Sequence, residues 1–174
     1  YIGNVLALHP EWNFISVPRT LAGGFDTAGV VFAGIDTGGR SIFLYDGATA
    51  SWKQLRSGDR IGALDGIWIY SASAASVPLV YAPWGSRSTL GKALYPGWNS
   101  MGIGSLQAVQ ARDAFRSMED KWEVAIGYDP VEQVYEQVIV RGGPGTHGDS
   151  RLVYPFRGYW TRVNGNCTYT AVLE

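Results

Sequence analysis

One stretch of seven residues occurs twice in this chain, and it constrains the fold more than any other feature. Residues 7–13 read Ala-Leu-His-Pro-Glu-Trp-Asn, and residues 93–99 read Ala-Leu-Tyr-Pro-Gly-Trp-Asn. Five of the seven positions agree, and the agreement includes the proline, the tryptophan and the asparagine. Chance is a poor explanation for such a match, so we interpret it as the most similar part of an internal duplication.

The duplication continues along the chain at three successive offsets. The stretch above is offset by 86 positions, Tyr45-Asp46 and Tyr128-Asp129 by 83, and residues 66–69 and 158–161 by 92. The second copy therefore loses three residues before its helix and gains nine between residues 138 and 158. The gained segment is rich in glycine, which is typical of a surface loop.

A unit of roughly 80 residues is longer than the repeats of solenoid proteins, whose periods are about 20–50. The sequence therefore predicts two tandem homologous domains, residues 1–86 and residues 87–174, joined by a short linker over residues 83–89.

The predicted fold is mainly β with short helices: each domain is sandwich-like or barrel-like and carries one short helix. Apolar side chains at helical spacing predict that helix, and in the two copies they are Phe25, Ala28, Phe32 and Ile35, and then Ala111, Phe115, Met118 and Trp122. The expected strands are residues 5–8, 12–17, 41–45, 52–55, 66–71 and 77–82 in the first copy, and residues 98–103, 123–128, 135–140, 158–163 and 169–173 in the second.

The composition argues against several classes of partner. Aromatic residues make up 13% of the chain and charged residues only 17%, with a formal net charge of −1. This balance provides no electrostatic attraction for nucleic acid or an anionic membrane. No apolar run reaches the roughly 18 residues of a transmembrane helix, so we expect no membrane span. Many aromatic residues and glycines with few charges are typical of β-rich extracellular proteins.

The sequence contains no convincing catalytic or metal-binding pattern, so we expect no enzyme, no metal and no cofactor. His147, Asp149 and Ser150 are the residue types of a hydrolytic triad, but they are near neighbours in a glycine-rich loop, and a triad needs side chains that packing holds in place. The same loop lacks the Gly-Lys-Ser/Thr ending of a phosphate-binding loop. Two histidines and Cys167 do not readily supply the three or four ligands of a zinc site.

Conserved spacing between the copies makes several aromatic and amide residues candidates for a repeated core motif. They are Trp12, Asn13, Trp68, Trp98, Asn99 and Trp160. Occurrence in both copies favours a role in two cores. The alternative is that the tryptophans form a platform on which sugars stack.

Two further sets of residues are candidates for surface roles. Asn166 begins the only N-glycosylation sequon, Asn166-Cys167-Thr168, in a Gly-Asn turn. Tyr1 and Ile2 are candidate interface residues, because an open strand edge at a terminus offers unpaired amides and carbonyls to a neighbouring sheet. Trp84 is a further candidate, because it lies in the linker and the repeat does not imply its burial.

Several of these stretches together resemble a known type of module. Residues 12–21, 27–32, 66–71 and 77–81, and in the second copy residues 95–99 and 158–160, resemble repeated modules of large cell-surface proteins of methanogenic archaea, of the sheath or S-layer type. The similarity covers nearly the whole chain, although residues 158–162 depart from the more apolar ending of such modules. The resemblance implies an envelope location, a structural or adhesive role, and no catalytic residues.

The function expected from the sequence is therefore structural. We expect an extracellular, self-assembling component of an envelope layer, sheath or filament, whose copies associate through strand edges and aromatic contacts. The alternative is an adhesion module that binds a glycan or another envelope protein. A hydrolase that depends on His147 is a third hypothesis, for which we expect no activity.

Overall fold

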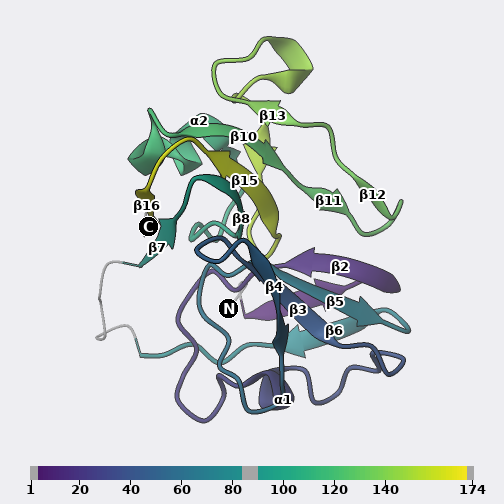
Figure 1. Cartoon of the computed structure of the whole chain (residues 1–174). Helices are drawn as coiled ribbons and strands as arrows, with labels where there is room; N and C mark the ends of the chain where they lie inside the picture. Colours follow the sequence, from purple (N-terminus) through teal and green to yellow (C-terminus); the bar gives the residue numbers. More distant parts are fainter. Residues whose placement is uncertain (1–3, 84–89, 172–174) are drawn as a thin grey trace.

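The computed structural model describes residues 4–83 and 90–171, and these residues form mainly antiparallel β-structure (Figure 1). We call residues 4–83 the first half and residues 90–171 the second half. The predicted boundary between residues 86 and 87 and the candidate interface residues Tyr1, Ile2 and Trp84 lie outside the described residues.

The first half consists of a four-stranded sheet, a two-stranded ribbon and one short helix. The sheet has the order β2-β5-β3-β4, and β1 pairs with β6. These elements are β1 (Val5–Leu8), β2 (Glu11–Ile15), α1 (Ala28–Val31), β3 (Ile42–Asp46), β4 (Ser51–Leu55), β5 (Ile67–Ser71) and β6 (Ala75–Pro78).

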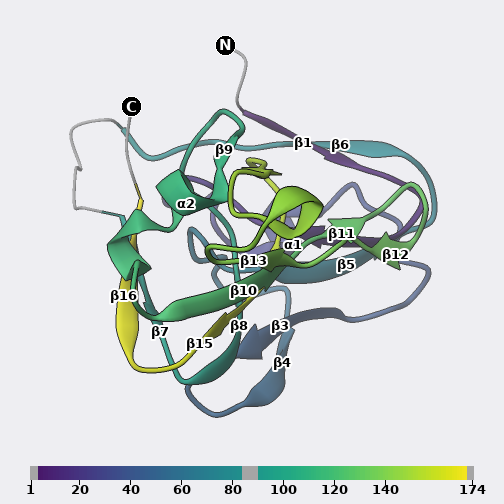
Figure 2. The ribbon, with the colours of Figure 1, turned by 90° about the horizontal axis from the view of Figure 1, so that it is seen from above.

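The second half has a four-stranded sheet of order β13-β10-β15-β8 and a ribbon of β7 and β16. Figure 2 shows the two ribbons, β1 with β6 and β7 with β16, each running side by side. The elements are β7 (Gly91–Leu94), β8 (Gly97–Met101), β9 (Val109–Gln110), α2 (Ala111–Ala114), η1 (Arg116–Met118), β10 (Trp122–Ile126), β11 (Tyr128–Asp129), β12 (Val134–Tyr135), β13 (Ile139–Val140), η2 (Gly145–His147), β14 (Leu152–Val153), β15 (Tyr159–Val163) and β16 (Cys167–Thr170).

Residues that lie opposite each other in paired strands of the first half have counterparts in the second half that also lie opposite each other, at the offsets found in the sequence. In the first half Tyr45 lies opposite Trp52, and 83 positions later Tyr128 lies opposite Tyr135. Phe43 lies opposite Trp68, and its counterpart Ile126 lies opposite Trp160. The glycine-rich residues 141–149 of the predicted insertion lie between β13 and β14 and include η2.

The repeated Pro-x-Trp-Asn motif has a local structural role in both halves. The side-chain amide of Asn13 accepts a hydrogen bond from the His9 N–H (2.9 Å) and donates to the His9 carbonyl (2.8 Å). Asn99 makes the same pair of bonds with Tyr95, at 3.0 and 2.8 Å. Both asparagines are buried, and these bonds replace the hydrogen bonds that their side-chain amides would make with water. Each asparagine thereby stabilises the turn that leads into β2 or β8.

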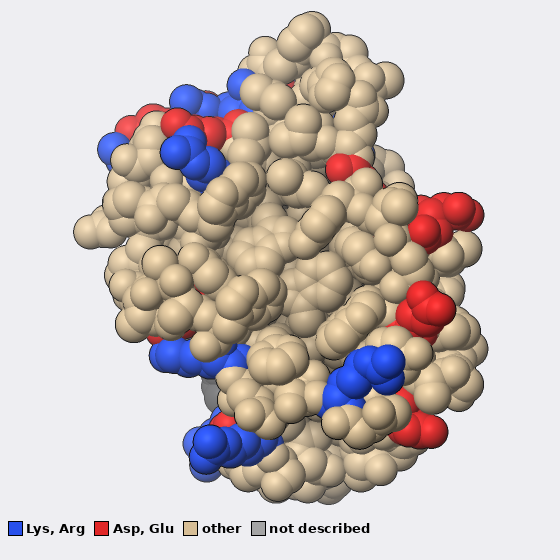
Figure 3. All heavy atoms as spheres, turned by 45° about the vertical axis from the view of Figure 1, so that its right-hand side comes forward, with Lys and Arg blue, Asp and Glu red and all other residues tan. Residues whose placement is uncertain are grey.

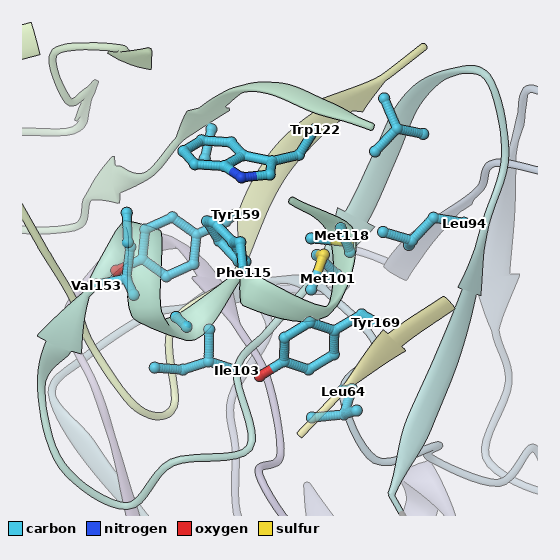
Figure 4. Close-up of a cluster of buried hydrophobic side chains, with 14 of the residues drawn as sticks. Leu64, Leu94, Met101, Ile103, Phe115, Met118, Trp122, Val153, Tyr159 and Tyr169 are labelled. Carbon is cyan, nitrogen blue, oxygen red and sulfur yellow. The ribbon is translucent and has the colours of Figure 1, made fainter. Parts of the chain in front are cut away.

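Each half contains its own cluster of buried apolar side chains. The larger cluster, in the second half, is built around Trp122, Phe115, Tyr159 and Tyr169 (Figure 4). The first-half cluster consists of smaller residues from β1, β2, β5 and β6 together with Ala28 and Phe32 beside α1. Cys167 is a free, half-buried thiol that packs against the second cluster.

The two halves exchange side chains and hydrogen bonds reciprocally. Leu64 of the first half is fully buried in the second-half cluster, whereas Phe156, its counterpart at offset 92, packs against the first-half cluster. The Gly102 N–H donates to the Leu64 carbonyl (2.8 Å), and the Ser16 N–H donates to the Phe156 carbonyl (2.9 Å). Through these reciprocal contacts each half completes the core of the other.

The sequence-based expectations about the fold need three corrections. The predicted helix of the first half is too long, because α1 covers only Ala28–Val31 and Phe25 is 51% exposed. The described residues form several open sheets and no closed barrel, so the barrel-like alternative is wrong. The predicted helix through Trp122 is also too long: α2 and η1 end by Met118, and Trp122 begins β10. The four residues of that predicted helical face are nevertheless all buried, because the chain turns at residues 119–121 and returns Trp122 to the same cluster.

The buried tyrosines lead to a prediction about alkaline pH. Burial raises the pKa of Tyr159 and of Tyr169, and it raises the pKa of Tyr81 to about 12. In the unfolded chain these phenols ionise near pH 10. Their contribution to stability is therefore complete below pH 10 and is lost as the pH rises above it, because only the unfolded state releases the protons.

We expect the last part of the phenolate absorbance to rise together with the loss of the circular dichroism signal in one alkaline titration. If all tyrosines ionised while the circular dichroism signal remained intact, the burial of these phenols in the folded chain would be contradicted.

Candidate functional site

A pair of hollows lined by aromatic side chains lies on the surface of the molecule. The first hollow has a volume of about 630 Å³ and is lined by Trp12, Phe43, Trp52, Trp68, Tyr128 and Tyr135. The second has a volume of about 460 Å³ and is lined by Tyr45, Trp52, Trp98, Ile126, Tyr135, Glu136 and Trp160. Trp52 and Tyr135 border both, so the two hollows form one continuous surface, which we call the aromatic face.

Strand alternation places these rings on the side of the sheets that faces away from the cores. On β5, Ile67 and Ile69 are buried in the first-half cluster, and Trp68 between them points to the opposite side. On β15, Tyr159 and Thr161 are buried and Trp160 points away. Each four-stranded sheet therefore contributes one tryptophan from an inner strand to the aromatic face: Trp68 from β5 and Trp160 from β15.

Each of these two tryptophans contacts the hairpin of the other half. Trp68 lies edge-to-face with Tyr128 (4.9 Å between ring centroids, 69° between planes) and Tyr135 (6.2 Å, 81°). Trp160 makes the same contacts with Tyr45 (5.2 Å, 71°) and Trp52 (5.5 Å, 87°).

Tyr128 and Tyr135 correspond to Tyr45 and Trp52 at the offset of 83, and Trp160 corresponds to Trp68 at the offset of 92. Corresponding residues therefore line the two hollows, with the contributions of the two halves exchanged. Edge-to-face packing of this kind adds about 0.5–1.5 kcal/mol per pair beyond the burial of area, which fixes the rings in place.

The rings at the border of the two hollows remain open to solvent. Trp52 is 54% exposed and Tyr135 is 57% exposed, and Trp98 is 39% exposed. Figure 3 turns this side of the molecule forward, and the centre of the view shows no Lys, Arg, Asp or Glu, while charged atoms lie at the periphery. A continuous exposed apolar surface of this kind marks an interaction site in a soluble protein.

Polar groups lie at the edges of the aromatic face. Glu136 borders the second hollow and is ion-paired with Arg157 (2.5 Å). Beside the first hairpin lies a third, polar hollow of about 310 Å³, whose lining includes Asp46, Lys53, Asp65 and Lys92.

The charged residues of the polar hollow neutralise one another, because Lys53 pairs with Asp46 and Lys92 with Asp65, each at 2.5 Å. The hydrogen bond from Lys53 lowers the pKa of Asp46, which keeps that carboxylate ionised. This arrangement suits polar binding and does not supply a proton donor near neutral pH.

In the structure two residues of the hydrolase hypothesis have other partners. The exposed His147 ring contacts the side chain of Gln137 (2.8 Å), whereas the Asp149 carboxylate accepts a hydrogen bond from the Gly142 N–H (2.8 Å). Within residues 4–83 and 90–171, no three His, Cys, Asp or Glu side chains gather closely enough to hold a metal ion. The same residues include no helix of sufficient length and apolarity to cross a membrane.

The repeated-motif residues fall into two groups. Asn13 and Asn99 are buried, but Trp12, Trp68, Trp98 and Trp160 all lie outside the two buried clusters and line the hollows. The expectation that these tryptophans fill two cores is therefore wrong. Asn166 is exposed in the turn between β15 and β16, and its glycosylation stays a prediction.

Sequence reasoning missed Tyr45, Tyr128 and Tyr135 as site residues. The available signal was their position: Tyr45 and Trp52 recur as Tyr128 and Tyr135 with the same spacing across a turn of the same length. Comparison with protein-family models, with curated proteins and with solved structures found no match.

Proposed function

We propose that the protein is a non-catalytic binding module whose aromatic face binds glycans at a cell surface. The observation that carries this proposal is the pair of open hollows in which tryptophan and tyrosine rings are held in place and left exposed. The C–H groups on one face of a sugar ring stack on such rings, while the hydroxyl groups around its edge need polar partners. Both kinds of group are present here, since the aromatic face is bordered by Glu136, Arg157 and the polar hollow.

The charge and shape of the aromatic face favour a neutral, extended ligand. The basic side chains at its border, Lys53, Lys92 and Arg157, are each ion-paired with a carboxylate, and the net charge is −1, so a polyanion finds little attraction there. Small apolar ligands are usually enclosed, with about 70–90% of their surface buried. Two adjoining open hollows instead fit successive units of a chain.

We also infer that the chain is a duplicated unit, as its sequence predicts. The shared strand register, the paired asparagine motifs and the exchanged aromatic contacts support this inference. An envelope location rests on the resemblance to archaeal surface modules and is part of the proposal.

Substitutions at the border of the two hollows test glycan binding. We expect Trp52→Ala to weaken the binding of a neutral oligosaccharide by at least about tenfold, because Trp52 borders both hollows and truncation of a central aromatic residue commonly costs about 2 kcal/mol or more. Isothermal titration against a panel of neutral oligosaccharides measures the effect.

Phe25→Ala is the matched control for Trp52→Ala, because Phe25 is a similarly exposed aromatic residue that lines neither hollow. Failure of every glycan to bind, or equal effects of the two substitutions, would remove the basis of the proposal.

The second candidate function is the self-assembling structural subunit. The same exposed apolar area favours it, because a second copy can cover such a face, and β4 is an edge strand of its sheet. Sedimentation at increasing concentration distinguishes the two candidates. Self-assembly predicts polymers that Trp52→Ala dissolves, whereas a glycan-binding module stays monomeric without its ligand.

A further inference from the structure

The hairpins β3–β4 and β11–β12 have turns of the same length, and they differ at a position from which one of them reaches the other half. Both turns have the same length, and in both the first aspartate caps the turn: Asp46 accepts from the Ala48 N–H (2.9 Å) and Asp129 from the Val131 N–H (2.8 Å). The residue before the returning strand has a positive φ in each hairpin, 48° at Ala50 and 55° at Gln133. The two turns therefore share their length, their cap and this positive φ, and at this position one carries Gln133 and the other Ala50.

The side chain of Gln133 binds the outer edge of β2. Its Oε1 accepts a hydrogen bond from the Trp12 N–H (3.0 Å), and its Nε2 donates to the Trp12 carbonyl (2.9 Å). The Tyr128 hydroxyl donates to the same Oε1 (3.0 Å), and the carbonyls of Pro130 and Pro10 accept from Nε2 at 2.7 and 3.4 Å. One carboxamide thus satisfies the amide and the carbonyl of a tryptophan whose ring lines the first hollow.

The outer edge of β8 lacks this partner. Trp98 is the counterpart of Trp12, and its N–H and carbonyl face away from β15, because the Ser100 carbonyl on the same side of β8 accepts from the Gly66 N–H. The first hairpin lies against this edge: a Cβ on Gly47 would be 3.3 Å from the Trp98 carbonyl. Ala50 has no polar group to offer, and among residues 4–83 and 90–171 nothing bonds to the outward N–H and carbonyl of Trp98.

We propose that this edge is a sugar subsite, in which two neighbouring hydroxyl groups of a glycan unit take the place that Gln133 fills in the other half. One hydroxyl accepts from the Trp98 N–H and the next donates to the Trp98 carbonyl. The Tyr45 hydroxyl, counterpart of that of Tyr128, supplies a further polar group. The sugar ring lies in the second hollow, which the Trp98 ring lines. This inference rests on the proposed glycan-binding function and assigns to it a neutral sugar with a free vicinal diol.

The directions of the Trp98 N–H and carbonyl favour a diol over an acetamido group as the ligand. An N–H and a carbonyl of one strand residue point the same way, so their partner must present an acceptor and a donor side by side. A primary carboxamide does so, as Gln133 shows, and so does a pair of adjacent hydroxyls. The trans secondary amide of an acetamido group points its N–H and its oxygen in opposite directions, so it does not match.

Reciprocal substitutions at the two equivalent positions test the subsite. Ala50→Gln introduces the side chain that fills the other edge, at a position whose backbone already has the φ of Gln133. Gln133→Ala empties the edge of β2. With cellotetraose and mannotetraose as probes, we expect Ala50→Gln to weaken binding at least tenfold, and we expect Gln133→Ala to add a second site to the stoichiometry measured by titration calorimetry. Thermal unfolding of Ala50→Gln shows that the variant is folded.

The outcomes separate this subsite from the proposed function. O-methylated tetraoses keep the stacking face but lose the hydroxyl donors, and we expect them to bind at least tenfold more weakly. Sugar binding that depends on Trp52 but is unchanged by Ala50→Gln would overturn the subsite and leave the proposed function standing. Absence of any sugar binding would overturn both. A probe peptide carrying asparagine or glutamine that binds more tightly than the sugars, and loses binding in Ala50→Gln, would assign the edge to a protein partner and overturn the sugar subsite.

Discussion

Replacing Trp122 with alanine is expected to lower the free energy of unfolding by about 3–5 kcal/mol, because a fully packed aromatic side chain is lost and the cavity left behind is only partly refilled. Trp122 is 1% exposed and packs against the Phe115 ring at 5.0 Å between centroids (Figure 4). Trp122 is the first residue of β10 and follows the turn after α2 and η1. Loss of its side chain therefore removes contacts between the strands of the second half and the helical segment.

The control for this prediction is Trp52→Ala, at an exposed tryptophan of the aromatic face. We expect a loss of about 1 kcal/mol there, mainly from the ring contacts with Tyr45 and Trp160. Urea denaturation of both variants measures the difference. A loss for Trp122→Ala no larger than that for Trp52→Ala would contradict the division of the tryptophans into a buried one and exposed ones.

Replacing Gly158 with alanine is expected to destabilise the protein by about 1–3 kcal/mol through overpacking between the halves. A Cβ at this position would lie 2.4–2.8 Å from three carbons of the Phe14 ring. Phe14 is buried and contacts both Trp68 (4.5 Å) and Trp160 (5.6 Å). Displacement of its ring therefore disturbs the rings at the base of the aromatic face, so we expect weaker ligand binding as well as lower stability.

Gly58→Ala provides the control, because a Cβ there meets open space. We expect its effect to lie within about 0.5 kcal/mol. The melting temperatures of the two variants measure the contrast, which for a protein of this size should amount to roughly 2–4 °C per kcal/mol. Equal melting temperatures would contradict the close packing of Gly158 against the Phe14 ring.

The strand segments could largely be anticipated from the sequence, because apolar and aromatic runs end at turn residues, but the pairing of the strands could not. Nor could the side of the sheet to which each tryptophan points. In Ile67-Trp68-Ile69-Tyr70 every residue is apolar or aromatic, so the period of two contains no polar residue that marks the outward face. The assignment of Trp68 to a core rested on its recurrence as Trp160, and this pattern offers nothing against it.

The contact between Gln133 and the edge of β2 could not be predicted from the sequence, for a different reason. Gln133 contacts Trp12 across 121 positions of sequence, and nothing local to either residue indicates the contact. The difference between Gln133 and Ala50 acquires meaning only when the structure shows that both lie at the same place in equivalent hairpins. The length of the helical segments was misjudged because Trp122 reaches the core from a strand and mimics a helical spacing.

The central claim, that the aromatic face is a glycan-binding surface, is tested most directly by the indole N–H signals of the tryptophans in nitrogen-15 NMR spectra. During titration with a neutral tetrasaccharide, the account predicts that the signals of Trp12, Trp52, Trp68, Trp98 and Trp160 shift, while that of Trp122 stays in place. Unchanged signals throughout, or a shift of Trp122 as large as the others, would contradict it.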